Sequence, residues 1–167
     1  VSHPKRGVSV SDSEDLIIDL PDETATIDLG RALAGVVQQA DVIALWGNRG
    51  AGKTTLARGL IQSRLSSGED VPSPAFTLVQ TYDTSKGEVW HADLYRLTST
   101  AEIEELGLSD AFESAICLIE WPDRLGDLRP EDALDLTLAQ AGQQDARRLT
   151  CRWDSDRWDA RVKAWLT

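Results

Sequence analysis

The chain has 167 residues, 41% of them hydrophobic, and a formal net charge of -11. This length and composition favour one domain with a buried core, and no apolar run approaches the ~18 residues of a membrane helix. The acidic charge argues against direct wrapping of DNA or RNA, which needs clustered Lys and Arg. The N-terminus has no apolar stretch of the secretory type, so we expect a cytoplasmic protein.

The N-terminal part predicts a tail, a strand and a helix. Residues 1–15 are rich in serine and charge and poor in apolar residues, which predicts a flexible tail and a single domain over residues 16–167. Apolar residues dominate positions 16–20, where we expect a short strand. Asp22 can cap a helix that runs to about Gln39, because apolar residues recur there at helical spacing and predict packing on a sheet.

The central motif of the chain follows this helix. Five apolar residues at positions 42–46 predict a strand, and they run directly into residues 47–55, GNRGAGKTT. This matches G-x-x-x-x-G-K-S/T, and a helix-forming run over residues 53–65 comes next. A glycine-rich turn without a ligand is the alternative interpretation. The order of strand, loop and helix favours a phosphate-binding loop instead.

Each residue type in the loop has a chemical reason. The glycines allow successive backbone N–H groups to turn inward around an anion, and the following helix N-terminus adds to the same site. Lys53 can reach the β- and γ-phosphates, and the Thr54 hydroxyl can bind Mg²⁺. The predicted nucleotide-binding residues are Gly47, Asn48, Arg49, Gly50, Ala51, Gly52, Lys53, Thr54, Thr55 and Trp121.

The next segment predicts a break followed by a hairpin. Residues 66–70 are polar, and two prolines spaced by one residue then stiffen an extended segment over residues 71–77. This segment is either a connector or a nucleotide-sensing loop. Residues 76–82 and 88–94 are rich in β-forming residues and predict the two strands of a hairpin.

The C-terminal half predicts a short helix, three strands and a last helix. Ser99 and Glu102 form a capping box, and Gly107 is placed to end that helix. A buried strand is predicted over residues 116–119, and residues 132–139 and 147–153 predict a second hairpin. The last helix carries Trp158, Val162, Trp165 and Leu166 on one face, which predicts core packing. Cys117 and Cys151 lie in predicted strands, as buried reduced thiols do.

Two carboxylates could complete a nucleotide site. Glu120 directly follows the buried strand, which is the pattern of a Walker B acid, and it would then face the Mg²⁺ held by Thr54. Asp93 could orient the attacking water or share the metal. Structural roles remain open for both, and His91 shares the strand face of Asp93. Trp121 either stacks near the base or fills the core.

These motifs together resemble the TsaE (YjeE) family, the ATPase component of bacterial tRNA threonylcarbamoyladenosine (t6A) biosynthesis. The resemblance covers about residues 16 to 139. It rests on residues 47–55, residues 73–79 (SPAFTLV), residues 91–97 (HADLYRL) and residues 118–121 (LIEW). The first motif occurs in many NTPases, and the four in this order are more specific.

The resemblance implies a P-loop NTPase-like, three-layer α/β fold with a mixed, largely parallel sheet and a C-terminal antiparallel extension. It also implies ATP and Mg²⁺ as ligands, weak ATPase activity alone, and partnership with TsaD and TsaB, which modify adenosine 37 of tRNA. In this interpretation the partners hold the tRNA. Lys53, Asp93 and Glu120 would be catalytic, and Thr54, Glu120 and Asp93 would hold the metal. Residues 73–77 would correspond to switch I.

Two positions depart from the family pattern. The family usually has Asp at Asn48 and Thr at Ala75, so a hydroxyl that could sense the nucleotide is missing at Ala75. Two other functions stay open, a small-molecule or nucleotide kinase and a nucleotide-binding regulatory module without significant catalysis. No arginine is clearly placed to act on a transition state, with Arg49 the one possible exception, so slow hydrolysis is expected for the isolated chain.

Overall fold

The computed structural model describes residues 9–10, 15–65 and 70–166, whose strands form one eight-stranded sheet. The strands are β1 (Ser9–Val10), β2 (Leu16–Leu20), β3 (Val42–Trp46), β4 (Val79–Thr84), β5 (Gly87–Asp93), β6 (Ile116–Glu120), β7 (Leu134–Gln140) and β8 (Arg147–Arg152). The α-helices are α1 (Glu23–Leu33), α2 (Lys53–Arg64), α3 (Ala101–Glu105), α4 (Leu108–Ala111) and α5 (Asp159–Leu166), and the 3-10 helices are η2 (Pro122–Leu128) and η3 (Asp156–Trp158). Within these ranges no helix is long and apolar enough to cross a membrane.

The centre of the sheet is parallel. The strand order is β1-β2-β8-β7-β3-β6-β5-β4, in which β3 pairs with β6 and β7, and β5 with β6, all in parallel. The outer strands join antiparallel, including the C-terminal hairpin of β7 and β8. This confirms the predicted mixed sheet. Leu45 and Asp93 both lie opposite Glu120, so the carboxyl ends of β3, β5 and β6 meet at one edge.

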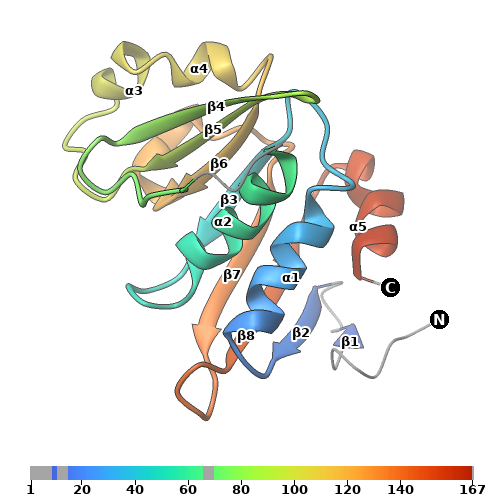
Figure 1. The fold of residues 1–167 in the computed structure, drawn as a ribbon. Helices are drawn as coiled ribbons and strands as arrows, with labels where there is room; N and C mark the ends of the chain where they lie inside the picture. The colour runs from blue at the N-terminus through green and yellow to red at the C-terminus, as the bar shows by residue number, and fades with distance from the viewer. Residues whose placement is uncertain (1–8, 11–14, 66–69, 167) are drawn as a thin grey trace.

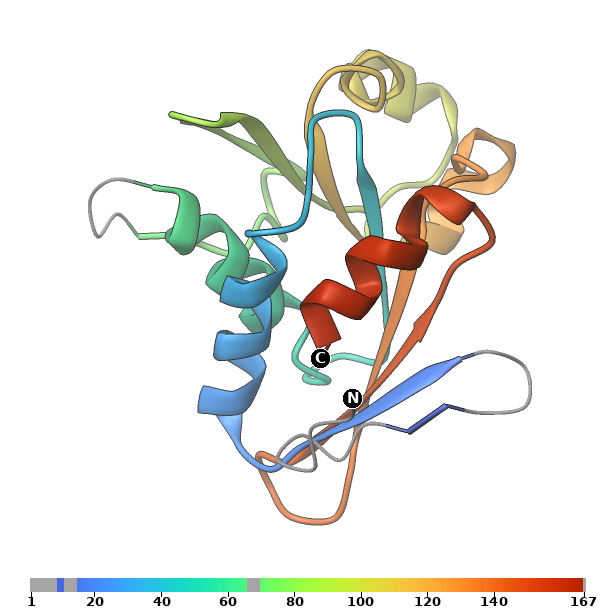
Figure 2. The same cartoon turned by 90° about the vertical axis from the view of Figure 1, so that its right-hand side faces the viewer.

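Helices cover the sheet on both faces. Helices α1, α2 and α5 lie on one face, and α3, α4 and η2 lie on the other (Figures 1 and 2). The first core includes Leu29 and Leu60, and the second includes Ile103 and Leu125. Because side chains of a strand alternate between faces, neighbouring residues of β3 and β6 serve different cores. The result is a three-layer architecture that holds the central strand ends rigidly.

Helix α1 is shorter than predicted. Asp22 caps it as expected, because its carboxylate accepts a backbone hydrogen bond from the first turn (2.8 Å). The helix ends at Leu33, however, and not at Gln39. Arg64 of α2 donates to two carbonyls of the segment 34–37, both at 2.9 Å. These tertiary hydrogen bonds satisfy backbone carbonyls just after the end of the helix. The helical spacing of apolar residues therefore extends further along the chain than the helix itself.

Two further boundaries differ from the prediction. Strand β4 begins at Val79 and not at residue 76, because Leu78 has φ 69° and its N–H donates to the Pro74 carbonyl within a turn. Helix α3 does not use the predicted capping box. Glu102 accepts hydrogen bonds from the backbone N–H and the hydroxyl of Thr98 (3.1 and 2.9 Å), and Ser99 does not cap the helix.

Part of the predicted N-terminal tail is structured. Ser9–Val10 form β1, which pairs antiparallel with β2. Asp15 is buried, and its carboxylate accepts two hydrogen bonds from Arg152 at 2.6 and 2.8 Å. Ser9–Val10 and Asp15, which belong to the predicted tail, therefore make defined contacts with the sheet. The remaining tail residues, 1–8 and 11–14, lie outside the described residues, as do residues 66–69 of the predicted polar break.

Helix α5 is fixed to the sheet by its apolar face and by one buried carboxylate. Trp158, Val162, Trp165 and Leu166 are all buried in the first core, as predicted. Asp41, fully buried just before β3, accepts hydrogen bonds from Arg157 and Arg161 at the start of this helical segment. A buried carboxylate is tolerated only when it is paired, so this ion pair locks the position of α5.

Both cysteines are buried in strands, which confirms the prediction of free thiols. Cys117 lies in β6 and Cys151 in β8, and neither side chain is exposed. Burial raises the pKa of Cys117 to about 12, mainly through desolvation, and it also raises the pKa of Cys151. Thiols in this environment are structural and unreactive.

Candidate functional site

The loop between β3 and α2 has the backbone that its glycines predict. Gly47, Gly50 and Gly52 have φ values of 141°, 76° and 105°. A Cβ atom at Gly47 would lie 2.4 Å from the Leu138 carbonyl oxygen of β7, so only glycine fits there. Gly52 is the N-cap of α2, and no described side chain caps this helix. The free N–H groups of the first turn are therefore directed at the space in front of the loop.

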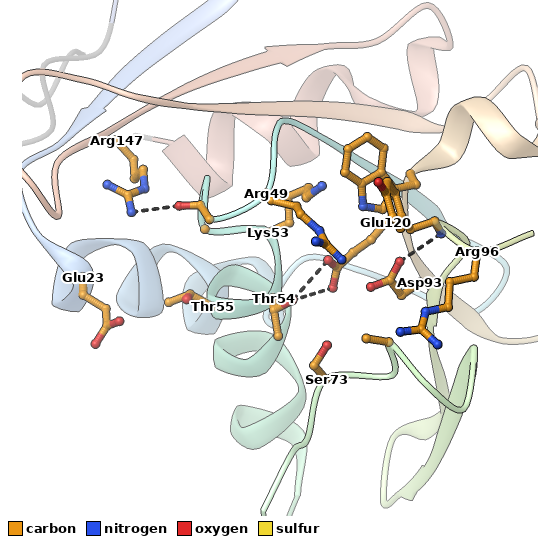
Figure 3. A pocket seen from close by; sticks show the side chains of 15 residues that line it. Glu23, Arg49, Lys53, Thr54, Thr55, Ser73, Asp93, Arg96, Glu120 and Arg147 are labelled. Atoms are coloured by element: carbon orange, nitrogen blue, oxygen red, sulfur yellow. Dashed lines mark hydrogen bonds between the residues drawn. The ribbon is translucent and has the colours of Figure 1, made fainter.

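This loop forms one wall of a cleft of about 400 Å³ (Figure 3). The lining residues are Glu23, Arg49, Gly50, Gly52, Lys53, Thr54, Thr55, Ser73, Ala75, Asp93, Tyr95, Arg96, Glu120, Trp121 and Arg147. Most of the predicted nucleotide-binding residues are among them. Gly47, Asn48 and Ala51 line a neighbouring hollow beside β7 instead. The cleft also receives Ser73 and Ala75 from the segment that resembles switch I.

The structure brings the three predicted metal-site residues together. Thr54, at the start of α2, donates a hydrogen bond from its hydroxyl to the Glu120 carboxylate, with Oγ1 2.9 Å from Oε2 and 3.1 Å from Oε1. Asp93 is the register partner of Glu120 on the neighbouring strand, and its Oδ1 accepts the Tyr95 N–H at 3.1 Å. The strand ends thus place two carboxylates beside the hydroxyl that follows the loop lysine.

His91 lies behind Glu120. Its Nε2 is 2.7 Å from Glu120 Oε2, and its side chain is fully buried. The two strands run parallel and place both residues on the α2 side of the sheet, as the alternation of side chains requires. Glu120 therefore has a polar neighbour on two sides, Thr54 towards the cleft and His91 towards the interior.

Lys53 is held inside the site. Only 5% of its surface is exposed, its Nζ donates to the Gly47 carbonyl at 2.6 Å, and Nζ lies 3.8 Å from the centre of the Trp121 ring. Burial lowers the pKa of Lys53 from its usual value, although the Glu120 and Asp93 carboxylates oppose that shift. Trp121 packs against the second core and also lines the cleft, so both roles considered for it from the sequence apply.

Sequence reasoning missed several residues of the cleft. Arg147, the first residue of β8, donates from Nη2 to the Gly50 carbonyl at 3.0 Å across 97 positions of sequence. Glu23, Tyr95 and Arg96 also line the cleft. Tyr95 lies 4.8 Å from the Arg49 guanidinium, measured to the ring centre, and stacks at a tilt on Trp121. Tyr95 and Arg96 lie within the same motif as Asp93, residues 91–97, which could have indicated them. No local pattern indicates Arg147 or Glu23.

The fold and the site define the class of protein. This is a three-layer α/β protein with a Walker A sequence at the junction of β3 and α2, opposite acidic strand ends. The family model described as "Threonylcarbamoyl adenosine biosynthesis protein TsaE" matches residues 20–149. The chain therefore belongs to the TsaE family, whose members take part in t6A biosynthesis on tRNA.

Individual relatives agree with this assignment. The tRNA threonylcarbamoyladenosine biosynthesis protein TsaE of Haemophilus influenzae is 38% identical over 124 residues, which covers 71% of this chain and 78% of the relative. The TsaE protein of Bacillus subtilis is 34% identical over 131 residues, covering 78% and 79%. The crystal structure of YdiB from Bacillus subtilis has a TM-score of 0.73 at 24% identity and covers 95% of both chains, so it shares the fold.

Proposed function

We propose that the chain binds ATP and Mg²⁺ in this cleft and hydrolyses the ATP as the ATPase component of t6A biosynthesis. The observation that carries this proposal is the contact between the Thr54 hydroxyl and the Glu120 carboxylate, directly beside the phosphate loop. Hydroxyl and carboxylate oxygens are the ligands that Mg²⁺ accepts in sites that also hold a nucleotide. Each comes from an element that a phosphate loop requires, the helix after the loop and the neighbouring parallel strand.

The cleft fits a polyphosphate. Gly50 and Gly52 open the loop backbone, and the first turn of α2 adds unpaired N–H groups and the positive end of the helix dipole. Lys53 and Arg49 add positive charge on the same side. The chain as a whole has a net charge of -11, so this local concentration of cationic groups indicates an anionic ligand.

The same residues fit Mg²⁺ bound to that polyphosphate. No group of three or more His, Cys, Asp or Glu side chains in the described ranges could hold a metal ion alone. Mg²⁺ does not need such a cage, because it usually combines one or two carboxylates with phosphate oxygens and water. A hydroxyl has one hydrogen and two lone pairs, so Thr54 can donate to Glu120 and still offer a lone pair to the ion. Asp93 would share the ion or its water.

Hydrolysis requires a water molecule held in line with the terminal phosphate. Asp93 is 9% exposed in the cleft wall and is our candidate for orienting that water, with Glu120 serving the metal and Lys53 the phosphates. The Arg49 guanidinium lies over the Tyr95 ring, and both side chains line the cleft. We therefore propose slow turnover for the isolated chain and faster turnover with partners.

The family assignment supports a role for the proposed ATPase in the t6A pathway. We propose that the chain works in the cytoplasm with TsaD and TsaB, and that the tRNA is held by those partners and not by this acidic chain. The proposed role is support of repeated turnover of the TsaD–TsaB complex during threonylcarbamoylation of adenosine 37. No transfer chemistry is assigned to this chain.

The test is to follow the γ-phosphate of radiolabelled ATP with and without TsaD and TsaB. We expect release of inorganic phosphate that depends on Mg²⁺ and increases with the partners. Lys53→Ala should abolish tight ATP binding, because it removes the ammonium group from the loop. Glu120→Ala should retain binding and lose hydrolysis. Transfer of the phosphate to a small acceptor, or normal hydrolysis by Glu120→Ala, would contradict the proposal.

A further inference from the structure

The His91 side chain makes one hydrogen bond within the described residues, and it is to Glu120. The imidazole is fully buried, and its Nδ1 atom has no hydrogen-bond partner in the described structure. A buried polar atom without a partner costs free energy, and an apolar side chain would carry no such atom. Core packing alone therefore does not account for a histidine here. What the imidazole adds is the bond from Nε2 to the carboxylate.

This bond fixes the protonation pattern of the ring. An ionised carboxylate can only accept, so beside Glu120 Oε2 the ring proton belongs on Nε2, and the partnerless Nδ1 then carries no hydrogen in the neutral ring. His91 is thus a donor to Glu120. The 2.7 Å distance is in the short range of hydrogen bonds to a charged acceptor.

The two oxygens of Glu120 are engaged unequally. Oε2 accepts from both His91 (2.7 Å) and Thr54 (2.9 Å), whereas Oε1 has only the longer Thr54 contact of 3.1 Å. The donors come from different elements, β5 and α2, so the carboxylate cannot rotate without breaking one of them. Oε1 is consequently the oxygen with lone pairs to spare.

We propose that His91 is a positioning residue of the hydrolytic site. Its Nε2–H holds the Glu120 carboxylate in one orientation, in which Oε1 and the Thr54 hydroxyl act together on the Mg²⁺ of the bound nucleotide. This inference rests on the proposed function of the same cleft. Residues that orient metal-binding groups in this way typically contribute 10- to 100-fold to metal affinity or activity.

Two variants of His91 separate positioning from packing. His91→Leu keeps an apolar body and removes the donor, whereas His91→Gln places an amide N–H near the position of Nε2. The matched control is Val89→Ala, on the same face of β5 and fully buried, but opposite Ile116 and not Glu120. Each purified full-length variant is assayed for ATP hydrolysis over a MgCl₂ titration at saturating ATP. ADP affinity in EDTA and a thermal melt are measured in parallel.

For His91→Leu we expect the MgCl₂ concentration at half-maximal hydrolysis to rise about 10- to 100-fold, with ADP affinity in EDTA unchanged. His91→Gln should recover most of the wild-type Mg²⁺ dependence. Val89→Ala should lower the melting temperature and leave the Mg²⁺ dependence as in the wild type. If His91→Leu does not fold, His91→Gln is compared with His91→Asn, whose shorter amide cannot reach Glu120.

A wild-type Mg²⁺ dependence in His91→Leu would overturn the inference. So would equal behaviour of the Gln and Asn variants, or a shift in Val89→Ala as large as that in His91→Leu. In each of these cases the wild-type protein still hydrolyses ATP, and the proposed function stands. A wild-type protein without Mg²⁺-dependent hydrolysis would overturn both the proposed function and the role of His91.

Discussion

Replacing Arg147 by methionine should weaken ATP binding. The Arg147 guanidinium donates from Nη2 to the Gly50 carbonyl (3.0 Å) and from Nη1 to two carbonyls of its own hairpin turn. No ion pair of the described residues includes it. Arg147 therefore acts on the loop backbone. Its hydrogen bond engages the Gly50 carbonyl oxygen, which would otherwise be free to repel a phosphate.

The magnitude follows from that contact. A hydrogen bond from a charged donor contributes about 1.5–3 kcal/mol. Arg147 is half-buried, so we take the lower end, about 1.5 kcal/mol, which corresponds to about tenfold in affinity. Methionine retains most of the apolar stem of the arginine, so packing changes little. The loss should affect ATP and ADP alike, because Gly50 belongs to the loop that would cradle both.

The assay is calorimetric titration of ATP and ADP into the purified variants. Arg148→Met is the matched control, because it removes the same charge from the next residue of β8. Arg148 is 56% exposed and pairs with Asp19, away from the cleft. We expect the control to bind ATP as the wild type does. Equal affinity of the wild type and Arg147→Met, or an equal loss in the control, would refute the assigned role of Arg147.

Three further predictions concern stability, thiol reactivity and pH. Asp41→Ala should lower the free energy of unfolding by about 3 kcal/mol in urea denaturation, because it breaks a buried ion pair. Asp19→Ala removes only the exposed ion pair with Arg148 and should lower the free energy of unfolding by under about 1 kcal/mol. Equal losses in the two variants would contradict this prediction. Cys117 and Cys151 should react with a thiol reagent only in denaturant, since burial raises both pKa values; rapid labelling of the native protein would exclude this. Burial lowers the pKa of Lys53 from its usual value of 10.5, so the ammonium should lose its proton, and ATP affinity should fall, at a lower pH than for an exposed lysine. A calorimetric profile that stays flat up to pH 10.5 would argue against a charged Lys53 in binding.

The sequence was sufficient for the part of the site that is local in the chain. Strand β3, the loop and α2 are contiguous, and each of their residue types has its own conformational or chemical requirement. Glu120 was also predictable, because a buried apolar strand must end at the edge of the sheet, and parallel strands bring such ends together. Asp93 was a candidate from its position in the sequence alone, with a structural role left open, and the structure places it opposite Glu120 on the neighbouring strand. The strand register therefore places the carboxylates of two separate motifs opposite each other.

The parts that failed depend on contacts between distant segments. Arg147 reaches Gly50 only because β7 lies beside β3 and β8 returns along β7, and no local pattern fixes that strand order. Helix α1 ends early because Arg64 binds the carbonyls that follow Leu33. The start of β4 was misplaced because Leu78 adopts a positive φ that its side chain does not indicate. Propensity yields to tertiary hydrogen bonds at the end of α1 and to a local turn at the start of β4.

The distribution of charge across the cleft bears on which ligand it suits. Arg147 lies on the α1 side of the loop, Asp93 and Glu120 lie on the other side, and Lys53 lies between them (Figure 3). A simple phosphate anion would be attracted by the loop and repelled by the two carboxylates. A nucleotide that carries its own divalent cation matches both halves, because the cation meets the carboxylates while the phosphates meet the loop. This arrangement supports a metal–nucleotide complex over free phosphate as the ligand.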